Sequence, residues 1–216
     1  MAEVRAPFAV QAAGRCPGLA ELVLAVGAEF RPVDTEGALS TLDLLAAAVA
    51  PARSASPPSE CEALASLLGD AVRLGEDGPQ SLMLDRVLDR GEGHPAMLAV
   101  VWAEVAQRAG IPVAPVGGPG LLLVAHLEAD PPLVLDPSRP AELLRPDEVP
   151  VRLRRRCSHE VAFTVLDELM DLYNLAGDMR HATRAAELRL ALPVRGRLLE
   201  WVRRETDALR AQLAAS

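Results

Sequence analysis

One helix-like segment in the middle of the chain constrains the fold more than any other feature. It begins at Pro95, which suits the first turn of a helix, and ends before Gly110, which suits the position just past the end of one. Between them, apolar side chains recur at helical spacing, at Met97, Leu98, Val101, Trp102 and Val105. The segment therefore predicts a central, mostly buried helix.

The pattern changes to that of β-strands after Gly110. Val113–Val116 is short and contains Pro115, which cannot donate a backbone hydrogen bond, so we expect an edge strand there. Leu121–Glu128 and Leu133–Asp136 are two apolar runs separated by a proline-containing turn, which is typical of a β-hairpin. A small antiparallel sheet should therefore follow the central helix.

Helical patterns lie on both sides of this part. They are expected at about 19–26, after the cap-like Asp34, and at 60–74, 81–89, 159–175, 179–191 and 195–213. The stretch 51–59 is rich in Pro and Ser, which indicates a linker. The order of helices, a small sheet and helices again is an α+β pattern. We predict N-terminal helices and linker at 1–59, a core at 60–150 and a C-terminal helical segment at 151–216.

Composition excludes several classes of protein. Half of the residues are hydrophobic, so a sizeable core can be buried, and the net charge of −8 argues against a generic nucleic-acid binder. Three separated cysteines form neither a disulfide framework nor a zinc site, and no cofactor motif is present. No signal peptide or membrane span is evident. Abundant Ala and Arg are typical of a GC-rich bacterial genome, and we expect a soluble cytoplasmic protein.

Several short motifs then occur in a shared order. They are Leu84–Arg90 with Gly93-His94-Pro95, then Val105–Pro112, Pro119–Val124, Leu135-Asp136-Pro137, and the helical stretch Leu169–Ala182. Over about residues 60–213 this set resembles the SirB1-type transglutaminase-like family. The resemblance implies a transglutaminase/papain-like core, in which a central helix packs on a small antiparallel sheet. It also implies that one tetratricopeptide-like helical pair follows.

The wider fold implies a catalytic Cys at the start of the central helix, a His on the following strand and an Asp on the next. At these positions the chain has Ala96 or Met97, then Leu121, then Asp136. Only the orienting carboxylate remains, which predicts a non-catalytic protein. We expect Leu121 to point toward the central helix and the cleft to be apolar and closed. Asp136 should then bond to backbone amides, His94 or an arginine.

A rival interpretation keeps the chain an enzyme. His94 immediately precedes the central helix and would lie beside Asp136 in the proposed fold, and a His–Asp pair can carry acid–base chemistry. That would give a hydrolase or acyl-transfer enzyme without a thiol. Its nucleophile would have to come from one of three serines, Ser81, Ser138 or Ser158.

The other histidine and cysteine candidates are weaker. His126 lies five residues beyond Leu121 on the same predicted strand, so it should lie on the opposite face, as a half-exposed residue. Cys61 opens a predicted helix without an evident His partner, and Cys16 and Cys157 lie outside the motifs. We expect structural or incidental roles for all three cysteines.

A short basic run at Arg152–Arg156 stands out in an acidic chain. Such a run is usually solvated or paired with nearby carboxylates, here Asp147 and Glu148. Contact with nucleic acid is a weaker alternative, because no aromatic residues alternate with the arginines. The expected partner is another protein or a peptide, and the C-terminal helical pair should pack as a lid on the sheet.

Overall fold

The computed structural model describes residues 7–53, 56–75, 78–118, 120–140, 143–144, 149 and 152–215. Its helices are α1 (Phe8–Ala12), α2 (Leu19–Ala28), α3 (Thr35–Val49), η1 (Ala50–Ala52), α4 (Pro57–Ala71), η2 (Pro79–Leu82), α5 (Leu84–Arg90), α6 (Pro95–Ala109), α7 (Ser158–Leu175), α8 (Met179–Arg189) and α9 (Gly196–Ala215). Its strands are β1 (Arg73–Leu74), β2 (Glu92–Gly93), β3 (Val113–Gly118), β4 (Leu121–His126), β5 (Leu133–Leu135), β6 (Leu143–Leu144) and β7 (Arg154–Arg155). The α+β prediction is confirmed.

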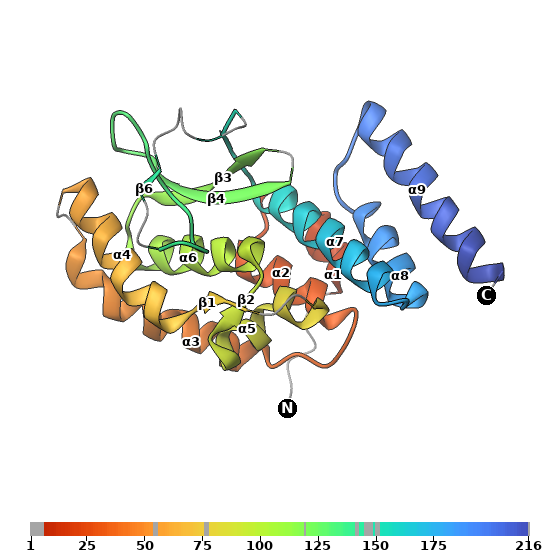
Figure 1. Ribbon diagram of the computed structural model, residues 1–216, viewed down its shortest axis with the longest axis horizontal. Helices are drawn as coiled ribbons and strands as arrows, with labels where there is room; N and C mark the ends of the chain where they lie inside the picture. The colour runs from red at the N-terminus through yellow and green to blue at the C-terminus, as the bar shows by residue number, and fades with distance from the viewer. Residues whose placement is uncertain are drawn as a thin grey trace.

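A five-stranded antiparallel sheet in the order β6-β5-β4-β3-β7 lies over helix α6 (Figure 1). Side chains alternate between its two faces, as strands require. The residues of the inner face join the main core with α6: Val113, Leu122, Val124 and Leu135. The residues of the outer face form a second, smaller cluster: Val116, Leu123, Ala125 and Val134.

Helix α6 confirms the central helix predicted from the sequence. His94 caps its N-terminus by accepting a hydrogen bond from the Ala96 amide, and Pro95 occupies the first turn. Gly110 ends it with a φ of 76°, a left-handed conformation that a side chain would strain. Most of its residues are buried, because the sheet covers one side and α2, α3 and α7 pack around the rest.

The prediction that the Pro115 strand is an edge strand was wrong. Strand β3 lies between β4 and the two-residue strand β7, and its carbonyl at Pro115 accepts a hydrogen bond from the Arg156 amide. The amide and carbonyl of one strand residue point to the same neighbour. The missing Pro115 donor therefore faces the short β7 and removes no bond to β4. Strands β6 and β7 form the edges.

The predicted linker was too long. Helix α4 begins at Pro57, and the Ser56 hydroxyl caps it by accepting a hydrogen bond from the Ser59 amide. Proline at the first helical position after a serine cap is a normal helix start, so the Pro-Ser composition concealed one. A second, two-stranded parallel sheet of β1 and β2 was also not predicted.

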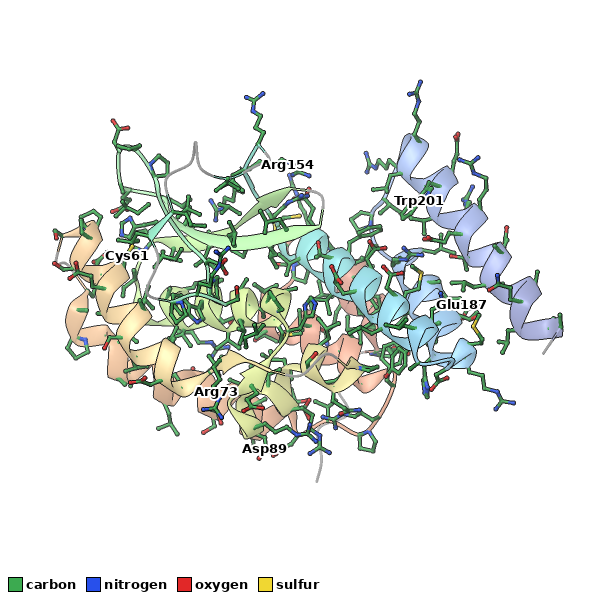
Figure 2. All side chains as sticks on the ribbon, viewed as in Figure 1. Cys61, Arg73, Asp89, Arg154, Glu187 and Trp201 are labelled. Atoms are coloured by element: carbon green, nitrogen blue, oxygen red, sulfur yellow. The ribbon has the colours of Figure 1, made fainter. Side chains whose placement is uncertain are left out.

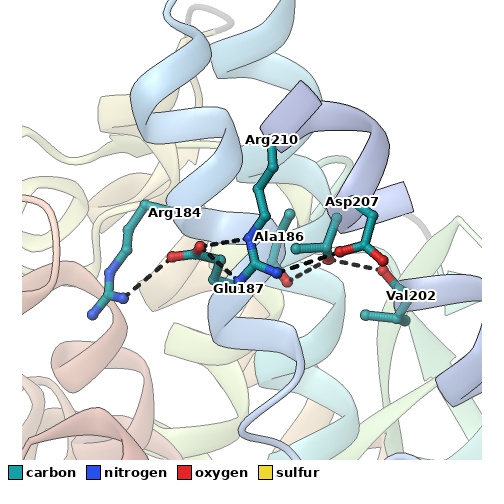
Figure 3. Close-up of polar contacts among 7 residues, drawn as sticks. Arg184, Ala186, Glu187, Val202, Asp207 and Arg210 are labelled. Carbon is teal, nitrogen blue, oxygen red and sulfur yellow. Dashed lines mark hydrogen bonds and ion pairs between the residues drawn. The ribbon is translucent and has the colours of Figure 1, made fainter. Parts of the chain in front are cut away.

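The three C-terminal helices form where the sequence predicted them. Helices α7 and α8 pack as a pair, and α9 packs on α8 at the end of the molecule (Figure 1). Arg189 of α8 is fully buried and ion-pairs with Asp167 of α7 and Glu205 of α9. At the surface, Glu187 binds both Arg184 and Arg210 (Figure 3).

The main buried cluster runs from Phe8 to Leu209, so side chains from all three predicted segments share one core. The division at 59 and 150 stays a prediction. Among the described residues, no helix has both the length and the apolar character needed to cross a membrane.

Candidate functional site

The start of α6 carries no nucleophile. Ala96 and Met97 are 5% and 0% exposed and pack in the main core. The His94 amide donates to the Ser81 carbonyl, and the Ala96 amide donates to the Nδ1 atom of His94. In a thiol enzyme of this fold the helix start would activate a cysteine. Here it presents buried hydrocarbon and one histidine.

His94 faces a carboxylate that the sequence did not point to. Its Nε2 atom lies 3.8 Å from Oε2 of Glu168 on α7, with the two side chains 16% and 33% exposed. Burial, helped by the nearby Asp171 carboxylate, raises the pKa of Glu168 above its ordinary value. Glu168 follows His94 by 74 positions on a helix with no local signal, so only the fold brings the two together.

Asp136 is satisfied by its own turn. One carboxylate oxygen accepts hydrogen bonds from the amide and the hydroxyl of Ser138, at 2.9 and 2.6 Å. The other accepts from Nε of Arg139 at 3.2 Å. The expected partners were backbone amides, His94 or an arginine, and an amide and an arginine are among the partners that Asp136 has. Of the three serine candidates, Ser138 is thus the one placed against Asp136. The proposed pairing of Asp136 with His94 stays a prediction.

Leu121 does not point toward α6, which corrects the expectation. It is half-buried and packs against the outer cluster, while its neighbour Leu122 points into the main core. The hairpin register sets this, because Gly118 pairs with Leu121 and the inner face begins one residue later. A shift of one residue moves a side chain to the other face of a sheet. The closed-cleft expectation therefore holds for Ala96 and Met97 but not for Leu121.

His126 lies on the other face of β4 from Leu121, as predicted, but it is 1% exposed rather than half-exposed. Its Nε2 atom is 2.7 Å from Oε2 of Glu60 on α4, which is also buried. A buried polar ring needs such a partner, and no local sequence pattern indicates this one because the two residues are 66 positions apart. The pair ties α4 to the inner face of the sheet.

Cys61 differs from the other two cysteines in being buried. It is fully buried on α4, and burial followed by the charges of Glu60 and Glu62 raises its pKa to about 11. It lies at the opposite end of the sheet from the start of α7 (Figure 2). A protonated, buried thiol is a poor nucleophile. Cys16 and Cys157 are exposed, and in the described structure all three cysteines are free.

The arginine run is paired with a different carboxylate from the expected ones. Arg154 and Arg156 both form ion pairs with Glu160 in the first turn of α7. Against the upward effect of burial, the Arg154 hydrogen bond lowers the pKa of Glu160. The predicted partners, Asp147 and Glu148, lie outside the described residues.

A cavity of about 510 Å³ opens beside this turn. We refer to it as the α7 cleft; its wall includes Gly118 and Gly120 of the β3–β4 hairpin, Phe163, Asp167 and Glu168 of α7, and Arg195 and Leu198 before and in α9. Through Glu168 it reaches the side chain of His94. The wall of the α7 cleft thus combines charged groups of both signs with apolar groups. In the described parts of the chain, no three His, Cys, Asp or Glu side chains are grouped to hold a metal ion.

Comparison with known proteins agrees with this fold. Residues 36–171 match the family model described as transglutaminase-like superfamily, core 2, which covers more than half of the chain. A UPF0162 protein of Pseudomonas aeruginosa is 33% identical over 142 residues, 61% of this chain and 50% of the relative. A UPF0162 protein of Xylella fastidiosa is 39% identical over 83 residues, 38% of this chain and 30% of the relative.

The chain therefore spans half or less of the curated relatives that it matches. No solved structure gave a significant match. The family match includes α3 through most of α7, and so crosses both boundaries predicted from the sequence. On the strength of that match and the helix-on-sheet core, this chain belongs to the transglutaminase-like superfamily.

Proposed function

We propose that this chain is a non-catalytic, SirB1-type member of the superfamily that acts as a binding or accessory subunit. The observation that carries the proposal is the start of α6, where Ala96 and Met97 are buried in place of an exposed thiol. The buried Cys61, with its pKa raised to about 11, offers no substitute. Without a nucleophile at this helix start, the fold retains a cleft but loses thiol chemistry.

The α7 cleft is the proposed binding site, and its occupant is a segment of another polypeptide. Phe163 and the 44%-exposed Leu198 offer apolar contacts, whereas Glu168 and Arg195 offer charges of opposite sign. An extended peptide presents both kinds of group along its length, together with backbone donors for polar walls. The volume, about 510 Å³, suits a few side chains.

A rival function has one observation in its favour. His94 lies beside Glu168, and a histidine oriented by a carboxylate can act in acid–base catalysis. In that reading the protein is a hydrolase or acyl-transfer enzyme, with a serine such as Ser138 near Asp136 as the nucleophile. We favour binding, because Ala96 and Met97 are buried at the start of α6 and the hydroxyl of Ser138 donates to Asp136.

Two measurements separate the readings. A photo-crosslinking residue at Leu198, inside the cleft, should capture a defined polypeptide in host cells. The same residue at Leu44, which is 70% exposed on α3, should not. An added Phe163→Asp substitution should abolish the Leu198 product. Equal capture at both positions would contradict the proposed site.

The enzyme reading is tested with ester, amide and γ-glutamyl substrates on purified protein. Turnover that disappears in His94→Ala and Ser138→Ala, while both variants stay folded by circular dichroism, would overturn the non-catalytic proposal. Turnover at the uncatalysed rate in the wild type would support it.

A further inference from the structure

A second cavity lies on the other side of the α7 start and takes no part in the proposed function. Its volume is about 700 Å³, and it is enclosed by the α1–α2 connection, the C-terminal half of α6 and the first turn of α7. We refer to it as the Arg15 cavity; residues from all three walls line it, among them Arg15, Cys16, Gln107, Ile111, Arg155 and His159.

Hydrogen bonds within the fold hold the walls of this cavity in place. The His159 ring is hydrogen-bonded to the Ala12 carbonyl at 3.0 Å, which joins the beginning of α7 to the end of α1. The Arg156 amide donates to the Pro115 carbonyl at 2.9 Å and fixes the opposite wall to the sheet. Because these walls are held by the fold, binding would require little ordering of the backbone.

Positive charge is in excess along the wall. Three arginines, Arg15, Arg155 and Arg156, face one carboxylate, Glu160. Glu160 is shared already between Arg156 and Arg154. Arg15 and Arg155 are exposed, and neither forms an ion pair or hydrogen bond through its side chain in the described structure. The wall of this cavity thus carries two guanidinium groups that are available to an anion, in a chain with a net charge of −8.

Part of the lining is apolar. Leu19, Ile111 and Val113 form the floor of the cavity from the main core, and Leu127 is 40% exposed at its side. A ligand that uses the whole cavity therefore needs an anionic group for the arginines and a hydrocarbon part for this floor.

We propose that the Arg15 cavity is a binding site for a small organic anion, a carboxylate or a phosphate monoester with a short apolar body. The guanidinium groups of Arg15 and Arg155 bind the anionic oxygens. Planar, paired N–H donors suit both carboxylate and phosphate geometry. The apolar body packs against Ile111 and its neighbours. The site shares the α7 first turn with the α7 cleft but does not depend on the cleft's function.

Titration calorimetry on the full chain tests the proposal with three probes of equal chain length: octanoate, octyl phosphate and octanol. The two anions should bind and the neutral alcohol should not. Comparison of octanoate with octyl phosphate then identifies the preferred head group. Raising the ionic strength should weaken anion binding, since both arginines are exposed. Absence of anion binding at millimolar concentration, or equal binding of octanol, would overturn the proposal.

Charge-removing variants place the site. The double variant Arg15→Ala and Arg155→Ala should weaken binding of the anions by tenfold or more, about the loss expected for a charge-assisted contact. Arg203→Ala is the matched control, because Arg203 is also exposed but lines neither the Arg15 cavity nor the α7 cleft. Unchanged affinity in the double variant, or an equal loss in the control, would contradict the assignment.

Cys16 gives an independent readout, because it lines the Arg15 cavity and is exposed. Alkylation of Cys16 by the neutral reagent iodoacetamide, followed by peptide mass spectrometry, should slow when octanoate or octyl phosphate is present. In the double arginine variant this protection should disappear. Protection that persists in the variant would show that the probe binds elsewhere, and the proposal would fail.

Discussion

Replacing Arg189 by Met should destabilise the C-terminal helices strongly. The guanidinium is 0% exposed, ion-pairs with Asp167, and lies 2.6 Å from Glu205. Its central carbon is also 5.8 and 5.5 Å from the rings of Phe163 and Trp201. Removing one partner from a buried charge network costs about 3–5 kcal/mol. For a chain of this size, that corresponds to a melting temperature lowered by roughly 6–20 °C.

Urea denaturation followed by circular dichroism measures the loss, and Arg184→Ala supplies the control. Arg184 is on the same helix and pairs with Glu29, but its side chain is 45% exposed, so about 0–1 kcal/mol is expected. Replacing Arg189, Asp167 and Glu205 together by apolar residues should recover part of the loss, because no charge is then left unpaired. A loss for Arg189→Met no larger than that for Arg184→Ala would refute the reasoning.

Three further results are expected. At pH 8 a thiol reagent should modify two cysteines of the native protein and leave Cys61, whose pKa is about 11, unmodified; a third native equivalent would contradict this. Burial raises the pKa of Glu168, so its carboxyl group keeps its proton to a higher pH in the native state than in the unfolded state. The free energy of unfolding should therefore fall as the pH rises from 4.5 through the raised pKa of the native state. Glu168→Gln should flatten this fall in urea midpoints measured at successive pH values, and an unchanged slope would count against it. His126→Ala should lower the free energy of unfolding, measured by urea denaturation, by about 3–5 kcal/mol. The double variant with Glu60→Ala should lose less than the sum of the losses of the two single variants, and additive losses would exclude the pairing.

The helices could be predicted because their ends are marked in the sequence. Pro95 and Gly110 bound α6, and the Asp34 side chain caps α3 by accepting from the Gly37 amide. The position of β3 within the sheet could not be predicted in this way. Whether Pro115 disturbs the sheet depends on which neighbour its missing amide faces, and that neighbour, β7, lies about 40 positions further along the chain.

In the candidate site, too, the features set by nearby residues could be predicted and those set by distant contacts could not. Ala96 and Met97 at the start of α6 could be read directly from the sequence, and a backbone amide and an arginine were among the partners expected for Asp136. The orientation of Leu121 was not, because it depends on a register that one residue can shift. Glu168 and the Glu60–His126 pair depend on contacts between distant helices and strands, for which the sequence contains no local pattern.

The edge strand β7 has a consequence for the behaviour of the protein at high concentration. An open sheet edge offers unpaired amides and carbonyls to the sheet of another molecule, which is a route to aggregation. Here that edge is two residues long, and both residues are exposed arginines, Arg154 and Arg155. Two molecules that paired through their β7 edges would bring these arginines close together, and only two residues of each strand could form hydrogen bonds. Replacing this pair by valines would remove that electrostatic protection while leaving the strand itself in place.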